Sequence, residues 1–145
     1  MTDEYTILKS IKKLNMDIDN ALNESINMYN LTASQCDILR YLIIHKDEKV
    51  CSTDIHLKLG ISRASVSVTL KKLRNGDFIV FKSVPYDERV KYILLTEKAV
   101  KIQENIERCF DNLIGAIYKD FSEEEKDKLY ILIKKMIENI NYSKH

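Results

Sequence analysis

The chain has 145 residues, the length of one ordinary domain and short for two independent ones. Three glycines, one proline and no tryptophan, together with abundant Leu, Ile, Lys and Glu, favour a mainly helical fold with few loops. The formal net charge of +1 selects no class of partner by itself, and three cysteines without a Cys-x-x-Cys spacing argue against a disulfide framework and a structural zinc site.

The first predicted element is a long amphipathic helix over residues 5–29, where apolar side chains recur at three- and four-residue spacing. Thr2 or Asp3 can cap this helix. Thr32 and Gln35 then have the spacing of a capping box, which predicts the start of a second helix.

The second predicted helix ends at Ile44, before a short polar turn. A third, short helix is expected to begin at a cap formed by Ser52 or Thr53 and to stop at Gly60, because glycine tolerates the left-handed conformation of a helix end. Ser62 follows two residues later and can cap a fourth helix. Two helices joined by so short a turn predict a helix-turn-helix.

The fourth predicted helix covers residues 63–75 and is closed by Gly76. The period then changes to that of extended chain over 78–82 and 90–95, which are rich in β-branched and aromatic residues and flank turn-forming residues at 85–87. This pattern predicts a β-hairpin directly after the helix-turn-helix.

Two more long helices are predicted in the carboxy-terminal third. Thr96 caps the first of them, which carries apolar residues from Ile102 to Ile117. Ser122 and Glu125 form a second strong capping box, followed by an apolar stripe that reaches Ile140. The expected fold class is therefore mainly α (α+β), with a two-stranded β wing between helices.

The positive charge of the chain is concentrated around the fourth helix and the hairpin. Between Lys58 and Lys91 there are eight basic residues and three acidic ones, while the rest of the chain is net acidic. On a helical wheel Val66, Leu70 and Leu73 fall together and must face the core. The opposite side presents small hydroxyl and apolar groups with lysines, which suits the major groove of DNA. The predicted major-groove residues are Ser62, Arg63, Ala64, Ser65, Ser67, Val68, Lys71 and Lys72.

The hairpin supplies a second predicted contact. Arg89 lies near its tip, two residues after Asp87, and an arginine there can enter the minor groove while the carboxylate holds its guanidinium in a fork. A lone Asp-x-Arg triplet is a weak signal, since it is usually a surface ion pair. It indicates a DNA contact here because it follows a helix-turn-helix. The predicted wing residues are Lys82, Asp87, Arg89 and Lys91.

These motifs together resemble the MarR (multiple antibiotic resistance regulator) family of winged helix-turn-helix transcriptional regulators. The resemblance rests on the runs at 59–62, 73–79, 87–89 and 95–99 and on the order of elements over essentially the whole chain. It implies a homodimer that straddles a pseudopalindromic duplex site, with the winged lobe at 32–96 and dimerisation helices at 4–30 and 97–141 of a single domain spanning 1–145. A repressor that a small-molecule effector releases is the form of regulation expected from it.

The chain departs from the family pattern at two positions. Gly76 lies one residue before the usual glycine, which leaves Asp77 in its place. Phe81 stands where the family commonly has an arginine in the first wing strand, and Lys82 is the candidate to replace that charge.

Dimerisation is also expected from the residues alone, because a compact winged lobe cannot cover the apolar stripes of three long helices. Two-fold symmetry would place two recognition helices in successive major grooves, about 34 Å apart, and predicts an inverted-repeat operator.

Other functions are weighed against this one. Tyr29, Cys36 and Tyr41 are candidates for an effector pocket, although aromatic residues at helical spacing are more often core. An oxidant sensor acting through a cysteine and a winged-helix protein-interaction module without DNA binding stay open as alternatives. The chain lacks the motifs of phosphate loops, nucleophile elbows and zinc peptidases, so we expect no enzyme, no cofactor and no metal site. The absence of a targeting segment and of an apolar run of roughly 20 residues predicts a cytoplasmic protein with no membrane partner.

Overall fold

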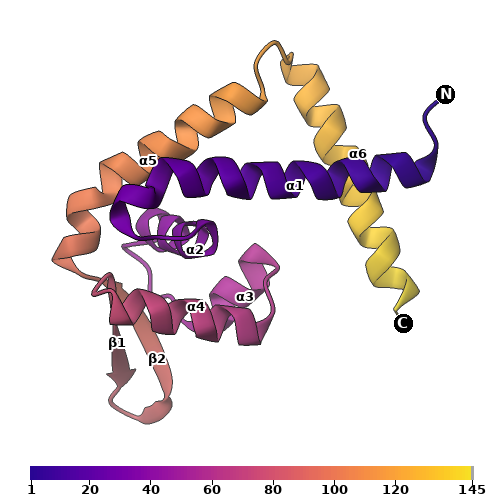
Figure 1. Cartoon of the computed structure of the whole chain (residues 1–145). Helices are drawn as coiled ribbons and strands as arrows, with labels where there is room; N and C mark the ends of the chain where they lie inside the picture. Colours follow the sequence, from indigo (N-terminus) through magenta and orange to yellow (C-terminus); the bar gives the residue numbers. More distant parts are fainter. Residues whose placement is uncertain (145) are drawn as a thin grey trace. The chain divides into compact units, whose positions relative to one another are not determined.

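The computed structural model describes residues 1–144, and within them six α-helices and one two-stranded antiparallel sheet form the fold (Figure 1). This architecture confirms the predicted mainly α fold with a β wing. The elements in chain order are α1 (Glu4–Ile26), η1 (Asn27–Tyr29), α2 (Ala33–Ile44), α3 (Ser52–Leu59), α4 (Arg63–Asn75), β1 (Ile79–Val84), β2 (Asp87–Leu95), α5 (Glu97–Ile117) and α6 (Glu123–Ser143).

Side-chain caps start the helices where the sequence predicts them, with one exception. The Thr32 hydroxyl accepts a hydrogen bond from the Gln35 backbone N–H, and the Gln35 side chain accepts one from Thr32 N–H at 2.7 Å. The prediction that Ser52 or Thr53 caps α3 is wrong, because Cys51 occupies the N-cap position. The Asp54 carboxylate accepts hydrogen bonds there from the Cys51 backbone N–H at 2.9 Å and from the Cys51 thiol at 3.2 Å.

Helix α4 buries one face in the core of the winged lobe. Val66, Leu70 and Leu73 are buried, as the helical wheel predicts, and α4 packs against α2 and α3. Replacing Leu70 or Leu73 with alanine would remove on the order of 2–5 kcal/mol of stability. The position of α4 is therefore determined by its inner face, and its outer face is left to solvent.

The wing is longer than predicted. Strand β1 continues to Val84 and β2 already begins at Asp87, so the tip consists of Pro85 and Tyr86 alone. The register pairs Ile79 with Leu95 and continues to the tip with one irregularity. Because side chains alternate along a strand, one face of the hairpin turns to α4 and the other faces away.

The turn between α4 and β1 has its left-handed residue one position after Gly76, the glycine that ends the helix. Gly76 has a φ of −83°, and the left-handed conformation falls on Asp77, at φ +64°. The Asp77 carbonyl accepts a hydrogen bond from the Thr96 hydroxyl at 2.5 Å, and Lys98 Nζ donates to the Gly76 carbonyl at 2.8 Å. Hydrogen bonds from Thr96 and Lys98 thus hold Asp77 in a conformation that glycine adopts more easily.

We expect Asp77→Gly to raise the free energy of unfolding by about 0.5–1 kcal/mol, since the glycine relieves left-handed strain and keeps both backbone hydrogen bonds. Thermal denaturation followed by circular dichroism measures the shift. Asp47→Gly is the matched control, because Asp47 has no positive φ and should gain nothing. An equal or lower melting temperature for Asp77→Gly would show that the corner is unstrained.

The described residues separate into two compact units, and the boundary falls inside α5. Residues 1–111 hold the winged lobe and α1. In this unit the carboxy-terminal end of α1 is buried at Leu22 and Ile26, while its amino-terminal half leaves Ile7, Leu8 and Ile11 exposed. In the second unit, from residue 112, α6 has no buried residue. No helix within residues 1–144 is both long and apolar enough to cross a membrane.

Candidate nucleic-acid interface

The outer face of α4 is open to solvent along its whole length. Ala64, Val68 and Lys71 lie on the side opposite to the buried residues, and Val68 is 54% exposed although it is apolar. The other predicted major-groove residues are exposed as well: Ser62, Arg63, Ser65, Ser67 and Lys72. A helix face of small side chains flanked by cations lets a base edge approach the backbone closely.

The first turn of α4 is held by its own serines. The Ser62 hydroxyl accepts a hydrogen bond from Ser65 N–H at 3.1 Å and donates one to the Ser65 hydroxyl at 2.9 Å. On this flank Ser34 of α2 joins Ala64, Ser65, Val68 and Thr69 around a shallow depression. Ser62 is thus engaged as a helix cap, and Ser65 retains acceptor capacity toward a ligand.

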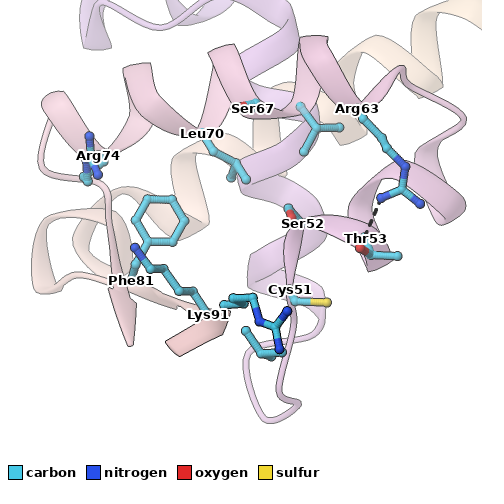
Figure 2. A pocket seen from close by; sticks show the side chains of 12 residues that line it. Cys51, Ser52, Thr53, Arg63, Ser67, Leu70, Arg74, Phe81 and Lys91 are labelled. Carbon is cyan, nitrogen blue, oxygen red and sulfur yellow. Dashed lines mark hydrogen bonds between the residues drawn. The ribbon is translucent and has the colours of Figure 1, made fainter. Parts of the chain in front are cut away.

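The opposite flank of α4 borders a deeper feature that we call the cationic hollow. It has a volume of about 350 Å³ and lies between the start of α3, one flank of α4 and the wing (Figure 2). Four of its twelve lining residues are basic and none is acidic. Its lining consists of Cys51, Ser52, Thr53, Arg63, Val66, Ser67, Leu70, Arg74, Phe81, Arg89, Val90 and Lys91. Four cations around one concave surface favour an anionic ligand.

Three of these cations are held in place by neighbouring side chains. Arg63 donates to the Thr53 hydroxyl at 3.3 Å, across the turn of the helix-turn-helix (Figure 2). The Arg74 guanidinium lies 5.5 Å from the centre of the Phe81 ring. Such contacts reduce the side-chain freedom that a ligand would otherwise have to remove.

The third restrained cation is Arg89, next to Asp87 on β2. The Asp87 carboxylate accepts hydrogen bonds from the Arg89 backbone N–H at 3.0 Å and from Nε at 3.4 Å. The expected two-pronged fork is thus replaced by one backbone and one side-chain contact, because the two residues are neighbours on the same strand. The Arg89 side chain remains 93% exposed, so its terminal nitrogens are available.

The two wing lysines lie on opposite faces of the hairpin. Lys91 is paired with Ser83 and shares the face of Phe81, whereas Lys82 is paired with Tyr92 on the other face. Lys91 lines the cationic hollow and Lys82 does not. The expectation that Lys82 replaces a charge at position 81 is therefore wrong, because one step along a strand reverses the side-chain direction.

Ser52, Thr53 and Arg74 line this site although the sequence did not predict them there. The helical spacing of Arg74 could have predicted its place in this site. It follows Arg63 by eleven residues and Ser67 by seven, which places all three on one flank of the helix. Thr53 and Ser52 carry none, because only the packing of α3 beside α4 brings them to the hollow.

The candidate effector residues differ in their exposure to solvent. Cys36 is completely buried, and burial raises the pKa of its thiol to about 12. Tyr41 lies five residues further along α2 and packs against His45, with ring centres 4.3 Å apart, while Tyr29 is half-buried at the end of η1. A thiol that stays protonated at neutral pH is a poor nucleophile, which weakens the oxidant-sensor alternative at Cys36.

Comparisons with known proteins agree with this geometry. A model of the MarR family matches residues 29–90, which contain α2, α3, α4 and the tip of the wing. The chain is 25% identical over 111 residues to the uncharacterized HTH-type transcriptional regulator YdgJ of Bacillus subtilis, an alignment that covers 77% of this chain and 66% of that relative.

Two solved structures extend the similarity to nearly the whole chain. The structure of the MepR–DNA complex of S. aureus has a TM-score of 0.86 at 23% identity and covers 96% of this chain and 99% of that one. A putative MarR family regulator from Listeria monocytogenes, complexed with 26mer DNA, has a TM-score of 0.81 at 25% identity, with 97% and 90% covered. The chain thus has the winged helix-turn-helix fold of these regulators, and its residues 29–90 match the model of the MarR family.

Proposed function

We propose that this protein binds duplex DNA sequence-specifically as a homodimer and represses transcription from the site that it covers. The observation that carries the proposal is the outer surface of the winged lobe, where an exposed helix face of small residues lies beside a hollow lined by four cations and no acid. Two relatives with the same fold are complexed with DNA in their structures, which supports the same ligand here.

In this proposal α4 enters the major groove. Ser65, Ser67, Ala64 and Val68 face the base edges, where hydroxyls form hydrogen bonds and the small apolar groups touch thymine methyls. Arg63, Lys71 and Lys72 neutralise phosphates on either side. The wing follows the backbone to the adjacent minor groove, which Arg89 enters while Asp87 orients it.

The homodimer is proposed from apolar surface that the chain leaves uncovered. On α1 the stripe that is buried at Leu22 continues toward the amino terminus as exposed Ile7, Ile11 and Leu14. On α6 the exposed apolar residues are Leu129, Tyr130, Ile131, Leu132, Ile133, Ile137, Ile140 and Tyr142. A second copy of the chain covers such stripes symmetrically, as in an isologous interface, and brings two recognition helices to one duplex.

Repression follows from occupancy, because a dimer bound across a promoter excludes other proteins from that stretch of DNA. Release by a small-molecule effector remains a prediction, and Tyr29, Cys36 and Tyr41 remain its candidate residues. A cytoplasmic location is the setting that this function requires.

Titration of labelled duplex at several salt concentrations tests the proposal. Each phosphate contact contributes about −0.9 to the slope of log affinity against log salt, so we expect a slope of about −5 or steeper for a dimer. Selection from randomised duplexes should then return an inverted repeat with half-sites about one helical turn apart. A winged-helix module that binds protein instead of DNA would show no steep salt dependence of duplex binding, and the selection would return no preferred sequence.

A further inference from the structure

The cationic hollow contains one arginine that the predicted interface does not include. Arg74 lies at the carboxy-terminal end of α4, is exposed, and lines the hollow together with Arg63, Arg89 and Lys91. Among the described residues it forms no ion pair with a carboxylate, and its guanidinium contacts the Phe81 ring. Its charge is therefore free to serve a ligand in the hollow.

Apolar and basic side chains both line the hollow. Val66, Leu70 and Phe81 line it from α4 and β1, while the basic groups come from α4 and β2 (Figure 2). A phosphodiester fits this lining, because its charged oxygens can meet the basic groups and the deoxyribose beside it can meet apolar side chains. The hollow also lies between the two elements that the proposed function places in neighbouring grooves, where a backbone strand must pass.

We propose that Arg74 binds a backbone phosphate of the duplex and that Phe81 is its positioning residue. This inference rests on the proposed function and adds to it a contact on the wing side of α4. The ring at 5.5 Å restrains a long, flexible side chain over the hollow before DNA arrives. Arg63, held by the Thr53 hydroxyl at 3.3 Å, performs the equivalent task at the other end of the helix.

The test uses the full chain and a labelled duplex of mixed sequence, because a phosphate contact is independent of sequence. Arg74→Gln should weaken binding about three- to tenfold and make the salt slope shallower by about 0.9 for each protomer on the duplex. Arg108→Gln is the matched control: it removes an exposed arginine of α5 outside the hollow and should keep the wild-type slope. A wild-type slope for Arg74→Gln would overturn the proposal.

A double-mutant cycle tests the positioning role of Phe81. Phe81→Leu should weaken binding about two- to threefold in the wild-type background and change nothing in the Arg74→Gln background, since the ring acts through Arg74. Phe81→Tyr keeps the ring and should restore wild-type affinity. Equal losses in both backgrounds would show that Phe81 acts by another route. If the wild-type chain itself showed no salt-dependent binding, the proposed function would fail, and that result is distinct from a failure at Arg74 alone.

Discussion

Arg89→Ala is expected to weaken binding to the selected duplex by about ten- to hundredfold while leaving the melting temperature and the mass of the dimer unchanged. The side chain is 93% exposed and it hydrogen-bonds to Asp87 at the surface, so its removal leaves no cavity in the core of the lobe. In the proposed complex its loss removes a cation from the minor groove, where negative potential is concentrated. Fluorescence anisotropy with duplex and matched circular dichroism melts measure both quantities.

Two controls make the Arg89 result specific. Arg108→Ala removes an exposed arginine of α5 and should bind as tightly as the wild type. Arg89→Lys keeps a charge but not the planar group, and we expect an intermediate affinity. Unchanged affinity in Arg89→Ala would show that the wing tip does not contact DNA and that α4 alone recognises the site.

Local signals explain why so much of the fold could be predicted. Thr32 with Gln35, Ser62 and Ser122 with Glu125 are caps whose chemistry lies within one helical turn, and the structure has all three. The inner face of α4 follows from a period of 3.6 residues, and its buried leucines agree. Such features depend on neighbours in sequence and need no knowledge of the rest of the molecule.

The predictions that failed depend on choices between adjacent residues or on distant contacts. Cys51 caps α3 instead of Ser52 because Asp54 is three residues after it and can complete the box. Asp77 and not Gly76 becomes left-handed, since hydrogen bonds from Thr96, just before α5, and from Lys98 hold that corner from 19 and 22 residues away. Neither outcome has a signature in composition or periodicity.

The cationic hollow shows the same limit at the functional site. Its α4 residues recur on one helical flank, but Thr53 and Phe81 reach it only through tertiary packing. The departure from the family pattern at Phe81 suggested a missing charge when the sequence was considered alone. The Arg74 guanidinium lies 5.5 Å from the centre of that ring, so a cation from α4 is present beside position 81.

Ile133→Asp is expected to convert the proposed dimer to single chains at micromolar concentration and to abolish specific duplex binding. Ile133 is 40% exposed on α6, among apolar neighbours one turn away at Leu129 and Ile137. Loss of this apolar contact removes roughly 1.5–3 kcal/mol from each protomer, and a buried carboxylate adds a desolvation penalty. Both protomers carry the substitution in an isologous interface. The dissociation constant of the dimer should therefore rise at least about hundredfold.

Sedimentation or light scattering gives the mass, and duplex titration gives the affinity. Lys135→Gln is the matched control, because it changes the net charge of α6 by the same single unit outside the apolar stripe and should leave both measurements as in the wild type. A single winged lobe contacts one half-site, so a monomer should retain weak, salt-dependent binding and lose the preference for an inverted repeat. A variant that kept the mass of two chains and bound the inverted repeat normally would place the dimer interface elsewhere than α6.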